Sequence, residues 1–319
     1  MLGVAIQVIN AFFALIAVVG LFGNLLIFYI IFRFSIMKNV SNIYTLTLVI
    51  ANLVYVCWIP FYLTEEYMGH WPFGVYMCKF HKFSGYVSYT VTNVLVTLIS
   101  ADRYLAICHP SKLNVFETYK FAMLTSILIW PVAAAFRAPL FTYAGINNKT
   151  ECSIMWPENA KSSWFIVNAV VGFLITSVLI LLMYLLVMIR LRKDESSSQQ
   201  RTVSLHANRA TTNLALMIAL AYLLCWTSYW FIAVIRRYGE EPENSKTYIF
   251  ILKISLALGV SYSSINPMLY FILDAKFRKC FNTIFGIRSA RIRRITTDAM
   301  NMELAKEAVE TANSDNSNS

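Results

Sequence analysis

Long apolar stretches without a charged side chain recur along the chain. Each approaches or exceeds the roughly 20 residues that an α-helix needs to cross a bilayer. Seven such stretches occur, at residues 1–32, 39–64, 83–101, 121–136, 162–189, 210–235 and 254–273. The fourth is short, but it continues to residue 143 if the long side chain of Arg137 snorkels or faces the bundle interior. The pattern predicts an all-α membrane protein, a bundle of seven transmembrane helices.

An eighth, different helix is predicted directly after the last stretch. In the segment FRKCFNTIF, Phe277, Phe281 and Phe285 recur at helical spacing with basic residues between them. This pattern is typical of an amphipathic helix on a membrane surface, here the inner leaflet. We therefore expect three parts: a seven-helix domain over residues 1–273, a surface helix over 274–287 and a cytoplasmic tail over 288–319.

Composition and charge agree with a membrane location. Hydrophobic residues make up 58% of the chain and charged residues only 14%, whereas soluble domains carry about a quarter charged residues. Because Lys and Arg accumulate on the cytoplasmic side, their distribution places the N-terminus outside. The net charge of +10 is then a topology signal, and no soluble basic face for nucleic acid is found. The first residues lack the basic region of a signal peptide.

Short motifs in and beside the stretches resemble those of one known family. In chain order they are GN, NIYTLTLVIAN, WIPF, WPFGVYMCK, DRYLAICHP, CW and NPMLY. Together they cover nearly the whole chain and are similar to those of the rhodopsin-like (class A) G-protein-coupled receptors. Pro60 and the WPFG turn most resemble the peptide-receptor branch that holds the somatostatin, opioid and allatostatin C receptors.

The resemblance implies a multi-pass plasma-membrane receptor that binds an extracellular ligand and activates a heterotrimeric G protein. The resembled branch suggests the inhibitory Gi/o class, and the family implies arrestin as a further partner. The residues implied in activation and G-protein coupling are Asp102, Arg103, Tyr104, Tyr184, Asn266, Pro267 and Tyr270.

The DR pair has an expected role in the resting state. We expect Asp102 to hold Arg103 at rest, and Arg103 to extend toward Tyr184 and Tyr270 when the bundle opens. Residues 201–213 contain no Asp or Glu that could hold Arg103 from the sixth helix. We therefore expect measurable basal activity.

A ligand site is expected in the outer half of the bundle. The third stretch has Gly85 where amine, opioid and somatostatin receptors carry an Asp, so a monoamine ligand is disfavoured. Aromatic and polar side chains instead predict an apolar cavity with few directional groups. They are Tyr62, His81, Gly85, Tyr86, Tyr89, Asn168, Trp226, Tyr229 and Trp230.

The sequence leaves more than one type of ligand open. Seven Glu residues in the outer loops form an expected acidic rim, which favours a basic neuropeptide. Basic residues share that rim, so the signal is weak. A small organic or sensory ligand is the alternative within the receptor class, and a non-signalling decoy receptor is a third possibility.

Three modifications are expected in this topology. Cys78 and Cys152 are the two cysteines that fall outside, where they can form a disulfide. Asn148 begins an outer-loop N-x-T sequon and is an expected glycosylation site. Cys280, in the surface helix, is either palmitoylated or an unmodified interfacial cysteine.

One departure from the resembled family concerns a metal site. Asn52 stands where the second helix usually has an Asp, so a sodium site with Thr92 and Asn266 would lack its full charge. We therefore predict no metal ion.

Other departures concern helix kinks. Thr176 and Ser228 replace two prolines, which weakens two expected kinks. Asn93, Thr176 and Tyr222 are polar where the family has an apolar packing triad, and we expect them to hydrogen bond one another.

Other classes of protein are disfavoured. A retinal protein needs a Lys in the middle of the seventh helix, but Lys253 lies at its outer end and Val260 occupies that depth. Neither intramembrane acids nor the inverted repeats of a transporter are visible. Four scattered His residues supply no catalytic or metal cluster, so we predict neither an enzyme nor a cofactor.

Overall fold

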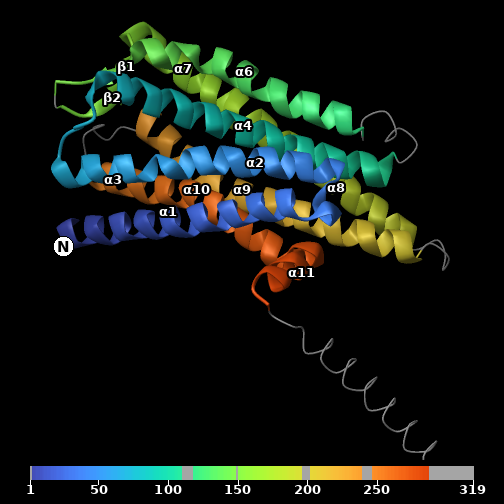
Figure 1. Ribbon diagram of the computed structural model, residues 1–319. Coiled ribbons are helices and arrows are strands. Elements are labelled where there is room, and N and C mark those ends of the chain that lie inside the picture. The colour runs from blue at the N-terminus through green and yellow to red at the C-terminus, as the bar shows by residue number, and fades with distance from the viewer. Residues whose placement is uncertain (1, 110–117, 149, 196–201, 239–245, 287–319) are drawn as a thin grey trace, which may run out of the picture. The chain divides into compact units, whose positions relative to one another are not determined.

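The computed structural model describes residues 2–109, 118–148, 150–195, 202–238 and 246–286. Within these ranges seven helices are long and apolar enough to cross a membrane, and they pack side by side as a bundle (Figure 1). They are α1 (Leu2–Arg33), α2 (Val40–Cys57) continued by α3 (Ile59–Met68), α4 (Gly74–Cys108), α6 (Tyr119–Tyr143), α7 (Glu158–Ala169) continued by α8 (Ile175–Glu195), α9 (Thr202–Tyr238) and α10 (Lys246–Leu273). The predicted seven-helix architecture is confirmed.

Local sequence explains where the second span begins, breaks and ends. The side chain of Asn39 caps α2 by accepting a hydrogen bond from the Asn42 amide at 3.0 Å. The span is interrupted at Trp58, two residues before Pro60, which has no backbone N–H to continue the hydrogen bonding of α2. Gly69 ends α3 in the left-handed conformation at φ 69°, which glycine adopts without steric cost. A 3₁₀ turn, η1 (Ser35–Met37), joins α1 to α2.

The fifth span departs from a regular helix in its middle. Residues Val170–Leu174 form a π-helical turn, η2, between α7 and α8. The loss of proline at Thr176 led us to expect a weaker irregularity here, but the wider turn supplies one without proline. The Thr176 hydroxyl donates to the Phe173 carbonyl at 2.8 Å, beside this turn. By contrast, α9 runs without a break past Ser228, and the expected weakening of its kink stays a prediction.

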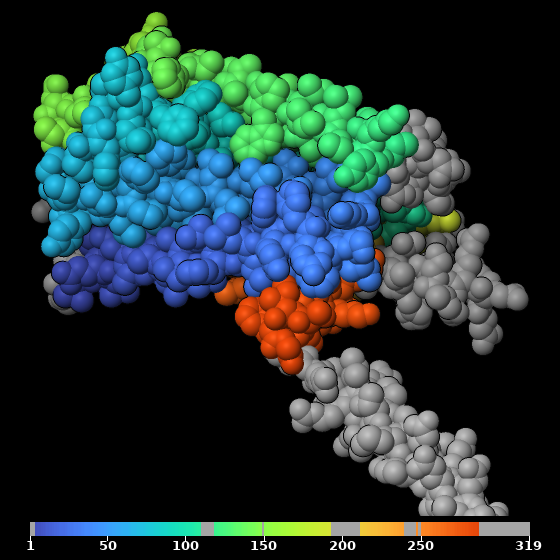
Figure 2. All heavy atoms as spheres, viewed as in Figure 1, coloured from blue at the N-terminus to red at the C-terminus, as the bar shows by residue number. Residues whose placement is uncertain are grey.

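Small residues allow α1 to lie close to α10. A Cβ atom on Gly23 would come within 2.8 Å of Pro267, and one on Gly20 within 2.7 Å of the Ser264 hydroxyl. The opposite side of α1 is apolar and exposed, for example at Phe22, as expected of a surface that faces lipid. In the space-filling view α1 and α2 form a continuous, close-packed face (Figure 2).

A short antiparallel hairpin follows α6. Strands β1 (Ala144–Ile146) and β2 (Cys152–Ile154) pair with Ala144 opposite Ile154. The hairpin lies at the end of the bundle where α4 begins (Figure 1).

The last described helix belongs to a separate compact unit that begins at Ala275. It is α11 (Ala275–Ile284), with Lys276, Arg278 and Lys279 in its sequence. The predicted helix is therefore present, while its place on the inner leaflet and the lipidation of Cys280 stay predictions. The cytoplasmic tail predicted over residues 288–319 lies outside the described residues.

Candidate functional site

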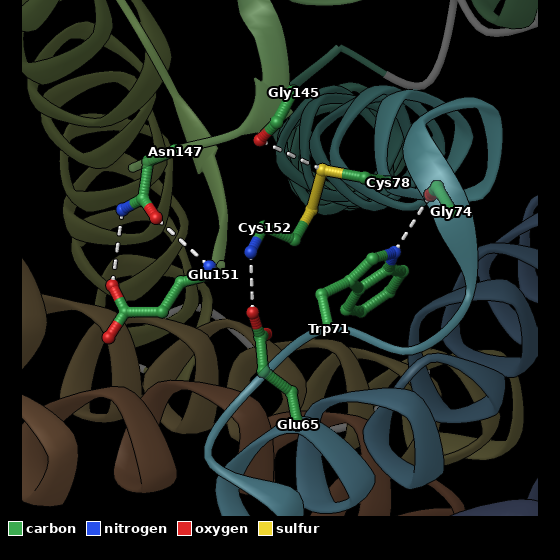
Figure 3. The surroundings of a disulfide bond; sticks show 8 residues. All are labelled: Glu65, Trp71, Gly74, Cys78, Gly145, Asn147, Glu151 and Cys152. Carbon is green, nitrogen blue, oxygen red and sulfur yellow. Dashed lines mark hydrogen bonds between the residues drawn. A yellow bond between two sulfur atoms is a disulfide. The ribbon is translucent and has the colours of Figure 1, made fainter. Parts of the chain in front are cut away.

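A disulfide and a buried tryptophan organise one end of the bundle, which we call the disulfide end (Figure 3). The predicted bridge between Cys78 of α4 and Cys152 of β2 is formed. Glu65 of α3 accepts a hydrogen bond from the Cys152 amide at 2.5 Å. Trp71, only 4% exposed, donates from Nε1 to the Gly74 carbonyl at 2.9 Å. These contacts hold the hairpin against α3 and α4.

A cavity of about 430 Å³ opens beneath the hairpin. Its volume lies in the range of small-molecule binding sites, roughly 300–1,000 Å³. All nine residues that the sequence predicted as ligand-binding line it. They are Tyr62 from α3, His81, Gly85, Tyr86 and Tyr89 from α4, Asn168 from α7, and Trp226, Tyr229 and Trp230 from α9.

Aromatic rings make a tightly connected group around Trp226. The Tyr89 ring lies 4.5 Å from that of Trp226, centroid to centroid, and the Tyr229 ring lies 5.8 Å from it edge-on. Trp226 also packs against the backbone of α10, since a Cβ atom on Gly259 would approach it to 3.1 Å. A ligand that enters the cavity therefore contacts side chains whose displacement would change the packing of α9 against α10.

Sequence reasoning missed more than half of the lining. A detectable signal existed for Lys82 and Trp164, which lie one helical turn before the predicted residues Tyr86 and Asn168. Most of the others come close only through helix packing and the hairpin. The additional lining residues are Phe13, Tyr55, Trp58, Ile59, Lys82, Ile154, Trp156, Lys161, Trp164, Phe165, Arg237, Leu256 and Val260.

The cavity has basic walls. Lys82, Lys161 and Arg237 line it, and none of its lining residues, all of them described, is an Asp or Glu. Two acids of the expected rim are engaged elsewhere: Glu65 holds the Cys152 amide, and Glu66 pairs with Lys253 at 2.5 Å.

Further rim acids do not alter this picture of the cavity. Glu151 accepts a hydrogen bond from Asn147, and Glu158 begins α7. The acids predicted at Glu240, Glu241 and Glu243 lie outside the described residues. The described walls thus carry the opposite sign from the expected acidic rim.

Arg137 faces the bundle interior, one of the two positions expected for it. Its exposed fraction is 0%. Nε donates to the Thr90 hydroxyl at 2.8 Å, and the guanidinium also hydrogen bonds to the Asn168 side-chain oxygen. The guanidinium lies over the rings of Tyr86, at 5.4 Å, and Trp164, at 5.9 Å. Its partners are therefore neutral.

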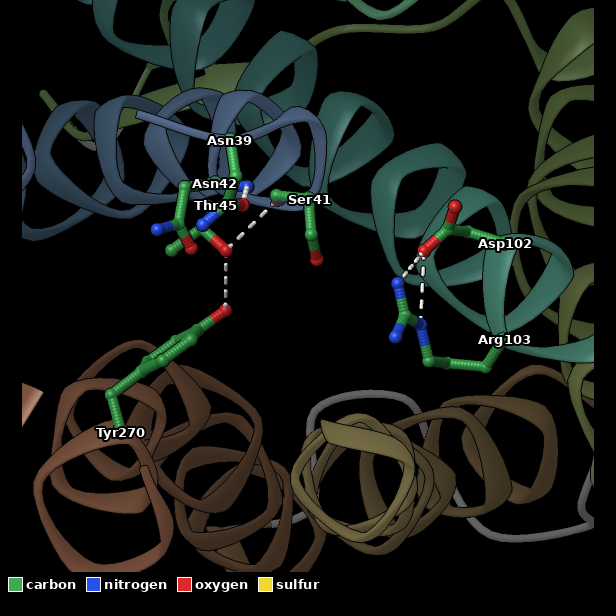
Figure 4. Close-up of polar contacts among 7 residues, drawn as sticks. All are labelled: Asn39, Ser41, Asn42, Thr45, Asp102, Arg103 and Tyr270. Carbon is green, nitrogen blue, oxygen red and sulfur yellow. Dashed lines mark hydrogen bonds and ion pairs between the residues drawn. The ribbon is translucent and has the colours of Figure 1, made fainter. Parts of the chain in front are cut away.

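The other end of α4 holds the predicted DR pair, in a region we call the arginine end (Figure 4). Arg103 Nε donates to the Asp102 carboxylate at 2.9 Å, and the two form an ion pair with side chains only 8% and 12% exposed. The Tyr270 hydroxyl instead points to Thr45 of α2, at 3.1 Å. In this state Arg103 hydrogen bonds to neither Tyr184 nor Tyr270 among the described residues.

The remaining predicted activation residues lie nearby or deeper in the bundle. The Tyr104 hydroxyl lies 3.1 Å from His109 Nε2. Tyr184 is buried, and its hydroxyl interacts with the side chain of Ser100 and with the charge of Arg103. Asn266 is 1% exposed, and Pro267 interrupts the hydrogen bonding of α10 next to it.

Neutral groups fill the position of the expected weak sodium site. Asn52 Nδ2 donates to Asn24 Oδ1 at 3.3 Å, and Asn24 Nδ2 in turn donates to the Gly20 and Ser263 carbonyls at 2.7 and 2.9 Å. Within the described ranges no group of three or more His, Cys, Asp or Glu could hold a metal ion. These amide donors pair with neutral acceptors, whereas Asn266 Oδ1 is buried without a partner at hydrogen-bonding geometry among the described residues.

The predicted polar triad is formed only in part. Asn93 Nδ2 donates to the Gly172 carbonyl in the π-helical turn, and Thr176 donates to Phe173. The buried Tyr222 hydroxyl interacts with the side chains of Thr176 and Tyr89. The expected contact is therefore present between Thr176 and Tyr222, whereas Asn93 bonds instead to a backbone carbonyl that the irregular turn offers.

Comparison with known proteins adds two findings. The model of a family described as "7 transmembrane receptor (rhodopsin family)" matches residues 23–270. The chain is also similar to somatostatin receptor type 5 of Bos taurus, with 28% identity over 293 residues, which cover 90% of this chain and 78% of that receptor.

Proposed function

Because the chain belongs to the rhodopsin family of seven-transmembrane receptors, we propose that it binds an extracellular neuropeptide and thereby activates a heterotrimeric G protein of the Gi/o class. Its family is one of receptors, not of enzymes, and membership makes it a multi-pass protein of the plasma membrane with a ligand and a G protein as partners. The peptide nature of the ligand and the Gi/o class are the finer parts of the proposal. They are supported by the similarity to somatostatin receptor type 5.

One observation carries the proposal: a single helix serves both ends of the bundle. Helix α4 contributes Gly85, Tyr86 and Tyr89 to the cavity, and Asp102 and Arg103 to the arginine end. At 1.5 Å per residue, about 21 Å of rigid helix separates Tyr89 from Arg103. A shift of α4 against its neighbours at the cavity therefore reaches the ion pair directly.

The proposed mechanism is a shift between two states of the bundle. A ligand displaces rings that pack on Trp226, which moves α9 relative to α4 and α10. Asp102 then releases Arg103, which extends toward Tyr184 and Tyr270 and opens the arginine end for the G protein. Pro267 supports this step, because a missing backbone hydrogen bond lets the end of α10 bend.

The proposal also includes an orientation. The disulfide end faces the outside of the cell and the arginine end the cytoplasm, as the distribution of Lys and Arg favours. Asn148 is exposed in the turn between β1 and β2, where a glycan would be accommodated. Arrestin is proposed as a second cytoplasmic partner on the family resemblance.

Guanine-nucleotide exchange on a panel of purified G proteins tests the function. The receptor is assayed in membranes, first without ligand and then with a neuropeptide library. We expect nucleotide exchange on Gi/o proteins, and we expect Arg103→Ala to abolish it. Arg33 is exposed at the end of α1, and the control variant Arg33→Ala should preserve the exchange. No exchange from folded receptor at the cell surface would contradict the proposal and favour a decoy receptor.

A small organic ligand is the second candidate, favoured by the size of the cavity. A volume of about 430 Å³ suits a compact molecule as well as the end of a peptide. Exchange triggered by a small-molecule library but by no peptide would support this alternative.

A further inference from the structure

The cavity combines open space with positive charge at Gly85. This residue lines the cavity, and a Cβ atom built on it meets no atom within 4 Å. Lys82 lies three residues earlier, on the same face of α4, and also lines the cavity. At the position where amine and somatostatin receptors carry an acid, this chain thus has Gly85, which leaves open space next to the positively charged Lys82.

Lys82 forms no ion pair with any carboxylate in the described part of the chain. Glu65 attracts it from a longer distance, but the Glu65 carboxylate hydrogen bonds to the Cys152 amide. Glu66, the next acid along α3, pairs with Lys253 of α10. Glu65 therefore offsets the charge of Lys82 only from beyond ion-pair distance, and Glu66 is engaged by Lys253.

Arg137 places a second positive charge directly behind the cavity wall. Two of the aromatic rings beneath its guanidinium, Tyr86 and Trp164, line the cavity, and so does its hydrogen-bond partner Asn168. Its second terminal nitrogen, NH2, has no hydrogen-bond acceptor among the described residues. A buried cation with only neutral partners exerts a strong field, because the surrounding dielectric constant is low.

We infer that the cavity recognises its ligand through an anionic group, a carboxylate, which Lys82 contacts and Arg137 stabilises from behind Tyr86 and Asn168. The carboxylate belongs either to a peptide, at its carboxyl terminus or on an acidic side chain, or to a small organic acid. The inference rests on the proposed function, in that it takes the cavity as the ligand site. It replaces the basic peptide that the sequence favoured.

Gly85 allows a test that needs no ligand. Gly85→Asp puts a carboxylate into the open space beside Lys82, and Gly85→Asn puts a neutral side chain of the same size there. We expect the purified, ligand-free Asp variant to melt at a higher temperature than the Asn variant, because its carboxylate neutralises the wall. Introducing Lys82→Met into both should reduce that difference. An Asp variant that melts at or below the Asn variant would overturn the inference.

Binding of matched probes provides a second, independent test. Aromatic-rich octapeptides are synthesised in pairs with a free carboxyl terminus or a carboxamide, and indole-3-acetate is paired with indole-3-acetamide for the small-molecule arm. Thermal stabilisation of the intact receptor ranks their affinities. We expect acids to bind about 10-fold to 100-fold more tightly than amides, the value of a hydrogen bond to a charged partner.

The variants should abolish that preference selectively. Lys82→Met and Gly85→Asp are expected to weaken the acid probes to the level of the amides, while Gly85→Asn keeps the preference. Amides that bind as tightly as acids to the unmodified receptor would contradict the inference even if G-protein exchange is observed. If the octapeptides show the preference for acid over amide, the carboxylate belongs to a peptide. If the indole compounds show it, the carboxylate belongs to a small organic acid.

Discussion

Trp230 donates a hydrogen bond from its indole Nε1 to the Tyr89 hydroxyl at 2.8 Å, which joins α9 to α4 inside the cavity wall. Both side chains are almost fully buried. The bond lies beside Trp226, whose ring packs on that of Tyr89. A ligand that separates these groups would therefore loosen the contact between the two helices.

The first prediction concerns this bond. Tyr89→Phe leaves the buried indole N–H of Trp230 without an acceptor, which costs about 1–3 kcal/mol. We expect a lower melting temperature for the single variant and a smaller additional loss when Trp230→Phe is combined with it. Strictly additive losses in the double variant would show that the bond does not couple the two helices.

The second prediction concerns the ion pair at the arginine end. Asp102→Asn removes the charged acceptor of Arg103, whose hydrogen bond is worth about 1.5–3 kcal/mol. We expect basal nucleotide exchange to rise toward that of the ligand-activated receptor, because the resting state loses this contact. Empty membranes and Asp102→Asn combined with Arg103→Ala are the controls. Basal exchange equal to that of empty membranes in both the unmodified receptor and Asp102→Asn would refute the role of the pair.

The third prediction concerns sodium. The amide of Asn52 is neutral and donates to Asn24, so the melting temperature of the receptor should be the same in sodium chloride and in choline chloride. Asn52→Asp introduces the charge missing from the sodium site that was expected with Thr92 and Asn266, and we expect it to make the melting temperature rise with sodium. A sodium-dependent shift in the unmodified receptor would contradict this prediction.

The fourth prediction compares two glycines. Gly23→Ala forces a methyl group to within 2.8 Å of the Pro267 ring, and such overpacking typically costs about 1–3 kcal/mol. Gly85→Ala is the matched control, because its Cβ meets open space and alanine favours a helix by about 0.5–1 kcal/mol over glycine. Thermal unfolding should therefore rank Gly85→Ala above the unmodified receptor and Gly23→Ala below it. Equal melting temperatures for the two variants would argue against the tight contact of α1 with α10.

Sequence alone determined the seven helices and much of the cavity. The length and apolarity of the spans dictate the architecture, because a backbone inside a bilayer must satisfy its own hydrogen bonds. Residues such as Tyr86 and Trp226 were predicted to share a site, since they fall in the outer half of the bundle. Cys78 and Cys152 were paired by their common location outside the membrane.

Only the tertiary structure decided the charge of that cavity and the shape of the fifth span. Whether Lys82, Lys161 and Arg237 line one cavity depends on how α4, α7 and α9 are rotated about their axes. The length and apolarity of a stretch do not specify that rotation. The sequence did not decide whether Arg137 snorkels or faces the bundle interior. The neutral partners that hold its side chain inside come from α4 and α7. The π-helical turn at Val170–Leu174 likewise depends on packing, because Asn93, far away in sequence, bonds to its Gly172 carbonyl.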